Sequence, residues 1–192
     1  MSSAGAVRLV TPRLVVRTPL LSDGARLLAY VTRNRPRFVP WDPTPPEGYF
    51  TESFWVERCE YIQFEIAEGR ALSLVMTDRA DLSGALAGRI NFTAIERGVF
   101  DACRLGYSVD GAYEGRGLMR EALEAAIAYV FDDLGLHRIM ANYQPTNERS
   151  GNLLRRLNFA VEGYARDYLF INGAWRDHVL TARINPRHLP PP

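Results

Sequence analysis

The chain has 192 residues, of which 23% are charged and 47% hydrophobic, and this size and composition fit one globular domain with a buried core. Its formal net charge is +1, so no strong overall field attracts nucleic acid or a membrane surface. Cys59 and Cys103 are too few for a disulfide framework or a zinc site, so we expect no bound metal. The chain shows neither a signal-peptide pattern nor an apolar run of about 18 residues, so we expect a cytoplasmic protein.

Hydrophobic periodicity and turn residues divide the N-terminal half into strands and helices. Ser22 is expected to cap the first helix, and Gly69 to end the second. The expected elements in order are a strand (Leu9–Thr18), a helix from Ser22 with a basic end, a proline-rich loop (residues 40–46), a helix (Thr51–Glu68) and three strands (Leu72–Thr77, Ala87–Ile95 and Cys103–Val109). Turns between these three strands are expected at residues 80–84 and 96–101.

The C-terminal half is expected to alternate in the same way. Gly135 ends a helix, Asn158 takes the left-handed position after another, and Asn172-Gly173 is a strong hairpin signal. The expected elements are a helix (Leu118–Phe131), a strand (Leu136–Tyr143), a helix (Asn147–Leu157) and two strands (Phe159–Phe170 and Ala174–Ile184). This order predicts an α/β (α+β) fold, with a mixed sheet of about seven strands and helices on both faces. Residues 1–185 would form this single domain, and the proline-rich residues 186–192 a loose tail.

The segment Glu114-Gly115-Arg116-Gly117-Leu118-Met119 joins a predicted strand to a predicted helix. Its two glycines leave backbone N–H groups without side chains in front of them. The start of the helix adds further unpaired N–H groups and the positive end of the helix dipole. Together these features predict a site for a phosphate or diphosphate group.

Other glycine-loop interpretations fit this segment less well. A P-loop requires the pattern G-x-x-x-x-G-K-[ST], which the chain does not contain. A dinucleotide fingerprint requires a third glycine where Arg120 stands. Taken alone, the segment is therefore either a diphosphate loop of another class or a plain turn that needs positive φ.

A second motif begins 28 residues after the glycine segment, where Asn147-x-x-Ser150 opens the next predicted helix. Residues 145–159 resemble the N-x-x-S-x-x-L-x-x-x-G-F segment of the GNAT N-acetyltransferases, and residues 114–119 resemble their pyrophosphate loop, Gln/Arg-x-x-Gly-x-Gly/Ala. The resemblance covers most of the chain and is greatest to the RimJ-like branch, the ribosomal-protein-alanine N-acetyltransferases. The other segments that fit this branch are RLVT (8–11), LVVR (14–17), Pro40-Trp41, LGYS (105–108), HRIMANY (137–143), EGYARDY (162–168) and WRDHVLT (175–181).

Three positions depart from the family pattern. Glu114 stands where these loops usually have Gln or Arg, and a carboxylate there would repel a diphosphate unless it points to solvent or caps the helix. Met119 replaces the last Gly or Ala, and Asn158 replaces the usual glycine after the second motif. None of these changes removes a backbone N–H donor.

The resemblance implies a mostly antiparallel sheet that splays in the middle, between Arg104–Val109 and Ile139–Tyr143, with acetyl-CoA in the gap. The pantetheine arm would pair with the backbone of Tyr107, Ser108 and Val109, and Asn147 would orient it or cap its own helix. Arg116 or Arg120 would add positive charge to a phosphate, or else remain solvated. The expected diphosphate ligands are the N–H groups of Gly115, Arg116, Gly117, Leu118 and Met119.

The reaction implied is direct attack of an amine on the thioester. An α-amino group titrates near pH 7.7–8.0, so part of it is already neutral near pH 7.5 and a strong base is less necessary than for lysine. Ser150 would give a proton to the leaving thiolate, or alternatively act as a first-turn cap; Tyr143 and Tyr168 are further proton-donor candidates. The candidates for a base acting through water are Glu162, Asp167, Asp42 and Asp101, each of which also fits a surface ion pair.

The acceptor site is expected at the opposite mouth. Trp41, Asp42 and Tyr168 would bind a protein N-terminus, with Asp42 pairing with its ammonium group, although Trp41 and Trp55 also fit a core role. The expected function is acetylation of an N-terminal alanine on a small-subunit ribosomal protein by a monomer or homodimer. The alternatives are acetylation of a small-molecule amine, and a CoA-binding ribosome-assembly factor with little turnover.

Overall fold

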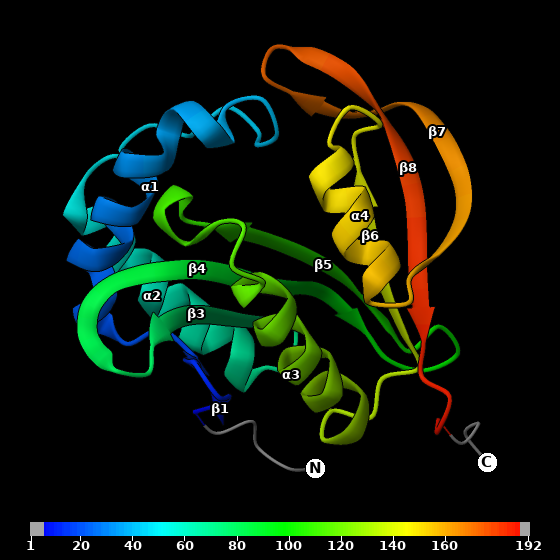
Figure 1. The fold of residues 1–192 in the computed structure, drawn as a ribbon, viewed down its shortest axis with the longest axis horizontal. Coiled ribbons are helices and arrows are strands. Elements are labelled where there is room, and N and C mark those ends of the chain that lie inside the picture. Colours follow the sequence, from blue (N-terminus) through cyan, green and yellow to red (C-terminus); the bar gives the residue numbers. More distant parts are fainter. Residues whose placement is uncertain (1–5, 189–192) are drawn as a thin grey trace.

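A computed structural model describes residues 6–188, which form one eight-stranded sheet with helices on both faces (Figure 1). The strands are β1 (Arg8–Val10), β2 (Leu14–Arg17), β3 (Leu72–Asp78), β4 (Asp81–Glu96), β5 (Ala102–Val109), β6 (Arg138–Tyr143), β7 (Ala160–Ile171) and β8 (Ala174–Ile184). The α-helices are α1 (Gly24–Phe38), α2 (Glu52–Ala67), α3 (Leu118–Asp132) and α4 (Glu148–Arg156), with short 3-10 turns η1 (Leu21–Asp23) and η2 (Gly111–Tyr113). The strand order is β1-β2-β3-β4-β5-β6-β8-β7, and every pair is antiparallel except β5 with β6.

The sheet has one strand more than expected, because the predicted strand at residues 9–18 is two strands. β1 and β2 form a tight hairpin in which Val10 pairs with Val15. Pro12 lies in the turn, where its missing N–H costs no ladder hydrogen bond. The Thr11 amide donates to the carbonyl of Leu14 at 2.9 Å, and its hydroxyl accepts from the Leu14 amide at 3.0 Å.

The expected cap at Ser22 is wrong. The carboxylate of Asp23 accepts a hydrogen bond from the Leu20 amide at 2.8 Å. The 3-10 turn η1 begins at the next residue, Leu21, and leads directly into α1 at Gly24.

The turn expected at residues 80–84 is also misplaced. Asp78 pairs with Asp81 and also accepts from the Ala80 amide at 2.9 Å, so β4 starts six residues before the predicted Ala87.

The predicted start of the sixth strand at Leu136 is two residues too early. The amides of His137 and Arg138 both donate to the carbonyl of Asp101, and this contact sets the start of β6 at Arg138. Two other local predictions are confirmed: Asn158, after α4, has a left-handed φ of +60°, and Asn172-Gly173 forms the turn between β7 and β8, with φ of +48° at Asn172. The Thr51 hydroxyl caps α2 by accepting from the Phe54 amide.

Two hydrophobic clusters hold the helices on the sheet. Trp55 of α2, 2% exposed, packs with Leu27 of α1 and with Val75 and Leu86 of the sheet, so Trp55 is a core residue. The other cluster joins α3 and α4 to the opposite face, through residues such as Leu123 and Leu154. Figure 1 shows α2 behind the sheet and α3 in front of it.

The central feature of the sheet is the divergence of β5 and β6. They pair in parallel only at Ala102–Arg138, Cys103–Ile139 and Arg104–Met140. Beyond these pairs β5 keeps its ladder with β4 as far as Val109, and β6 keeps its ladder with β8 as far as Tyr143. The facing edges of β5 and β6 therefore open into a wedge, which confirms the predicted splay.

The predicted domain limits and the loose tail stay predictions. Arg187 forms an ion pair with Asp132, and the His188 amide donates to the carbonyl of Asn185 at 3.3 Å. Residues 189–192 lie outside the described residues. None of the helices in residues 6–188 combines the length and apolarity needed to cross a bilayer.

Asp23 is expected to make stability depend on acid. Its buried carboxylate binds Arg17 at 2.6 and 2.9 Å and Arg26 at 2.8 Å. Burial alone would raise the pKa of Asp23, but the hydrogen bonds from Arg17 and from the Leu20 amide, with the charges of both arginines, lower it overall. Because the folded-state pKa is depressed, this stability is present above the unfolded-state value and is lost as pH falls through the folded-state value.

Asp23→Asn should therefore cost about 2–3 kcal/mol of unfolding free energy at neutral pH, since it leaves two arginines unpaired. The cost should shrink as the pH falls below about 4, where the unfolded carboxyl protonates. Urea unfolding over a pH series measures this, with the exposed Glu47→Gln as the control. A cost that is the same at every pH would contradict the prediction.

Candidate active site

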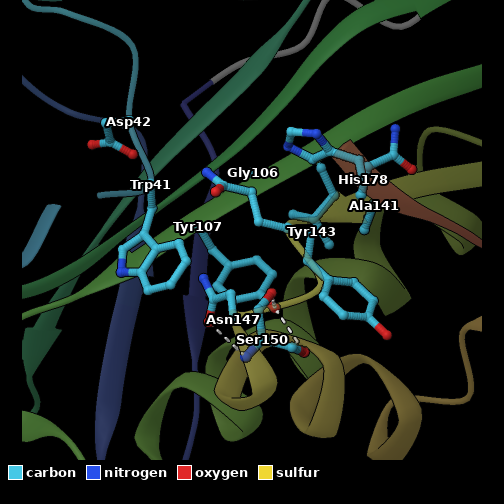
Figure 2. A pocket seen from close by; sticks show the side chains of 12 residues that line it. Trp41, Asp42, Gly106, Tyr107, Ala141, Tyr143, Asn147, Ser150 and His178 are labelled. Atoms are coloured by element: carbon cyan, nitrogen blue, oxygen red, sulfur yellow. Dashed lines mark hydrogen bonds between the residues drawn. The ribbon is translucent and has the colours of Figure 1, made fainter. Parts of the chain in front are cut away.

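A cavity of about 180 Å³ lies in the wedge between β5 and β6 (Figure 2). Its walls come from both strands, from the loop after α1, from the start of α4 and from β8. The lining residues are Trp41, Asp42, Leu105, Gly106, Tyr107, Ala141, Asn142, Tyr143, Gln144, Asn147, Ser150 and His178. The structure therefore brings together six of the predicted site residues: Trp41, Asp42, Tyr107, Tyr143, Asn147 and Ser150.

The glycine loop presents open backbone amides. Gly115 and Gly117 have φ of +71° and +74°, and both are exposed. No atom lies within 4 Å of where a Cβ on Gly115 would stand, and at Gly117 only the tip of Arg13 does, at 3.8 Å. Within residues 6–188, no oxygen accepts a hydrogen bond from the amides of residues 115–119. The loop can therefore offer a row of donors at the start of α3 to an anion.

Side chains on α1 hold this loop in place. Asp110, just before the loop, accepts from Arg33 at 2.6 Å, from Asn34 at 2.8 Å and from the Ala112 amide at 2.8 Å. The Asn34 side chain in turn accepts from the Gly111 amide at 3.0 Å. Burial would raise the pKa of Asp110, but these hydrogen bonds and the charge of Arg33 lower it. Asp110 and Asn34 are thus positioning residues that sequence reasoning missed, although Asp110-Gly111 is itself a turn signal.

Glu114, one of the three positions that depart from the expected pattern, neither points to open solvent nor caps α3. Its carboxylate pairs with Arg37 of α1 and, at 2.6 Å, with Arg149 of α4. These two arginines neutralise it and tie the glycine loop to helices on both sides of the wedge. Arg116 lies over the Tyr113 ring, 5.6 Å from its centroid, and Arg120 pairs with Glu124 at 2.8 Å.

Ser150 forms a hydroxyl pair with Tyr107 across the wedge, with Oγ and Oη 2.8 Å apart. Burial raises the pKa of Tyr107 to about 12, against a smaller opposite effect of the Ser150 hydrogen bond, so this phenol keeps its proton at neutral pH. Asn147 caps α4, because its side-chain oxygen accepts from the Ser150 amide at 3.1 Å. The Ser150 hydroxyl is therefore not the helix cap and is free to act in the cavity.

Aromatic and polar side chains complete the lining of the cavity. Trp41 and Asp42 approach from the loop after α1, and His178 from β8. Tyr168 lies behind this wall, where its hydroxyl accepts from Asn142 at 3.3 Å and its ring centroid is 5.5 Å from that of His178. Desolvation raises the pKa of Asp42, and the charge of Arg89 opposes this shift.

The comparison with known families decides the class of this protein. A family model described as "Acetyltransferase (GNAT) domain" matches residues 13–160, which is more than half of the chain. The chain belongs to the GNAT acetyltransferase family. This confirms the family, the fold class and the enzyme class that the sequence motifs predicted.

Relatives and solved structures agree with this membership. The acetyltransferase is 46% identical over 189 residues to the [ribosomal protein uS5]-alanine N-acetyltransferase of Escherichia coli, covering 98% of this chain and 96% of the relative. The ribosomal-protein-S5-alanine acetyltransferase of Vibrio fischeri superposes with a TM-score of 0.91 at 36% identity, covering 96% and 100% of the two chains. Mycobacterium smegmatis RimJ, solved with a CoA-disulfide, has a TM-score of 0.85 at 27% identity, with 97% and 89% covered.

The other base candidates of this acetyltransferase do not line the cavity. Glu162 pairs with Arg138, at the end of β6 farthest from Tyr143. Asp167 is exposed on β7, and its amide donates to Asp177 at 2.9 Å. Asp101 pairs with Arg97 before β5 begins. Among residues 6–188, no group of three His, Cys, Asp or Glu side chains could hold a metal ion.

Tyr143 lines the cavity but its hydroxyl is turned away from the Tyr107–Ser150 pair. Figure 2 shows the Tyr143 hydroxyl pointing away from Trp41 and Tyr107. Its ring packs against α4, where a Cβ on Gly151 would come within 2.7 Å of it. Of the predicted hydroxyl groups, that of Ser150 is the one paired with Tyr107 across the wedge.

Proposed function

We propose that this acetyltransferase transfers the acetyl group of acetyl-CoA to the α-amino group of an N-terminal alanine on a small-subunit ribosomal protein. The observation that carries the proposal is the 46% identity, over almost the full length of both chains, to an enzyme named for alanine acetylation of ribosomal protein uS5. The cavity supports it, because it lies between the open edges of β5 and β6 and its lining includes an aromatic side chain, Trp41, and a carboxylate, Asp42. Such an acceptor would place the enzyme in the cytoplasm.

The residues that would hold acetyl-CoA fit the group. The unpaired edge of β5 offers the backbone of Tyr107, Ser108 and Val109 to the pantetheine amides. The backbone amides of Gly115, Arg116, Gly117, Leu118 and Met119, which have no acceptor within residues 6–188, would receive the diphosphate, and Asn147, at the start of α4, borders the arm. When bound, acetyl-CoA supplies the thioester carbonyl carbon and a thiolate leaving group.

Ser150 would act as the proton donor to the leaving sulfur. With Tyr107 donating to the Ser150 oxygen, the serine hydrogen is free to point into the cavity. The tyrosine keeps its proton because burial raises the pKa of its phenol to about 12. The two hydroxyls thus form a short relay that ends at the cofactor side of the cavity.

Asp42 and Trp41 would receive the acceptor terminus. The Asp42 carboxylate at the mouth pairs with an ammonium group, and the indole of Trp41 covers the small alanine side chain. Tyr168 supports this wall from behind by its contacts with Asn142 and His178. A free α-amino group is partly neutral near pH 7.5, which suits direct attack.

A panel of acceptors tests the proposed function. Peptides with the N-terminal sequence of uS5 should gain one acetyl group at the α-amine, as read by mass spectrometry with fragmentation. The same peptide with a blocked N-terminus and an internal lysine should gain none, and spermidine or free alanine should react far more slowly. Preferred acetylation of a small amine, or CoA binding without turnover on any peptide, would contradict the proposal.

Glu114→Gln should bind CoA more tightly than the wild type. The change removes the only carboxylate that the described structure places on the glycine loop and leaves Arg37 and Arg149 to face the diphosphate. Because all three groups are partly exposed, we expect a gain of about 1 kcal/mol, or roughly fivefold in Kd, at low salt. Calorimetry at low and high ionic strength measures this gain in CoA affinity. A gain that persists at about 1 M salt, or a loss of affinity, would contradict an electrostatic origin of the effect.

A further inference from the structure

His178 is a buried, titratable side chain in the cavity that neither the glycine loop nor the serine relay uses. It lies on β8, is 4% exposed and lines the cavity. Figure 2 shows its imidazole at one end of the cavity, with Asn147 and Ser150 at the other. A proton-accepting group here would therefore stand on the acceptor side, opposite the proton donor.

The hydrogen bonds of His178 define which nitrogen carries the hydrogen. Its Nδ1 lies 2.9 Å from the carbonyl oxygen of Arg176. Because a carbonyl oxygen only accepts, Nδ1 must carry the hydrogen, and in the neutral ring Nε2 then has a free lone pair. Within residues 6–188 no side chain or backbone group donates to this Nε2. The ring is thus fixed by the backbone of its own strand, with its basic nitrogen unused.

The groups around His178 come from four elements. Asp42 approaches from the loop after α1, Tyr143 from β6 and Tyr168 from β7, while Asp177 and Arg176 are its neighbours on β8. Asp177 is directed away, because its carboxylate accepts from the Tyr164 hydroxyl at 2.5 Å and from the Asp167 amide. Asp42, open to solvent at the mouth, is left as the group best placed to attract an ammonium group before it reaches the imidazole.

We propose that His178 is the general base of the acyl transfer, and this rests on the proposed function at the same site. The acceptor ammonium first loses one proton to solvent, giving the neutral amine. As its nitrogen forms the new N–C bond, it gives a second proton to Nε2 of His178, while the C–S bond breaks and the sulfur takes the Ser150 hydrogen. Tyr107 restores that hydrogen, and the imidazolium proton returns through solvent to the tyrosine. The third hydrogen stays on the amide, so protons and charge balance.

An imidazole fits this role better than the carboxylates. A general base needs an unpaired lone pair within reach of the reacting amine. Glu162 and Asp101 are paired with arginines away from the cavity, and Asp42 is exposed at the mouth. His178 is the buried member of this set, and it lines the cavity.

Two substitutions separate the base from the structural role of the ring. His178→Asn can keep the donor to the Arg176 carbonyl but has no basic nitrogen, and His178→Gln places an amide near the Nε2 position. Both should lower kcat about 100-fold, a typical effect of losing a general base, with the Kd for CoA changed less than about twofold. Asp42→Asn serves as the comparison and should mainly raise the KM for the peptide.

Chemical rescue and NMR make the test decisive. Added imidazole should raise the kcat of His178→Ala at least about tenfold, and should leave the kcat of Ser150→Ala unchanged. In ¹⁵N NMR of the free enzyme, the ring-nitrogen signals of His178 are identified by their absence from the spectrum of His178→Asn. These signals should show that the hydrogen of the neutral ring is on Nδ1. A wild-type rate in His178→Asn, no rescue by imidazole, or an Nε2–H ring would each overturn the proposal. If the wild type prefers another amine, the proposed function fails, and the same variants then test His178 with that amine.

Discussion

Gly117→Asp is expected to weaken CoA binding more than any other single change at the loop. Gly117 stands at the start of α3 with φ of +74° and open space in front of it. A carboxylate there would face the bound diphosphate across a few ångströms, where like unit charges repel by about 4 kcal/mol at an effective dielectric constant of 20. Solvent exposure reduces this, so we expect about 2 kcal/mol, or roughly a 30-fold increase in Kd.

Gly117→Asn is the matched control for this change. Asparagine has the same shape and meets the same backbone strain at positive φ, which Asn and Asp tolerate better than other residues. In calorimetry, the Kd of Gly117→Asn for CoA should therefore lie within about fivefold of the wild-type Kd. The difference in Kd between Gly117→Asp and Gly117→Asn should become smaller at high salt. An Asp variant that binds CoA as well as the Asn variant would remove the loop from the diphosphate site.

Ser150→Ala is expected to reduce kcat about 100-fold, the lower part of the range for loss of a general acid or base. Helix α4 should survive, because its cap is the Asn147 side chain and not the serine hydroxyl. The Kd for CoA should stay within about twofold, since the expected diphosphate ligands are backbone amides on another loop. Stopped-flow detection of thiol release together with calorimetry separates these two quantities.

Tyr107→Phe provides the graded comparison for Ser150. It removes the phenol that lies 2.8 Å from the serine oxygen while keeping the ring that packs against the core. We expect a smaller fall in kcat, about tenfold, because the serine can still donate but has lost its partner. Equal rates for wild type, Ser150→Ala and Tyr107→Phe would show that neither hydroxyl delivers the proton.

The features predictable from sequence are those whose chemistry is local. Gly115 and Gly117 between a strand and a helix, the Asn147 cap and the Asn172-Gly173 hairpin are each decided by a few adjacent residues, and the structure has all of them. Strand propensity alone does not reveal that the predicted strand at residues 9–18 is two strands, because the turn at Pro12 lies inside a run of β-forming residues. The real signal was Thr11, whose hydroxyl closes the turn on Leu14.

The parts of the site that could not be predicted depend on residues far apart in the sequence. The Tyr107–Ser150 pair joins positions 43 residues apart, and Glu114 meets Arg149 across 35 residues. His178 gave no signal of its own, because a single histidine in a strand pattern is compatible with either face of the sheet. Its role depends on the wedge between β5 and β6, which only the register of the sheet reveals.

Intact-mass analysis of ribosomal proteins tests the central claim most directly. Ribosomes are purified from cells of the source organism with the gene intact, with the gene deleted, and with the deletion complemented by the wild type or by Ser150→Ala. One small-subunit protein with an N-terminal alanine should lose the mass of a single acetyl group in the deletion strain and regain it only with the wild-type gene. Unchanged masses for every ribosomal protein in the deletion strain would contradict the central claim.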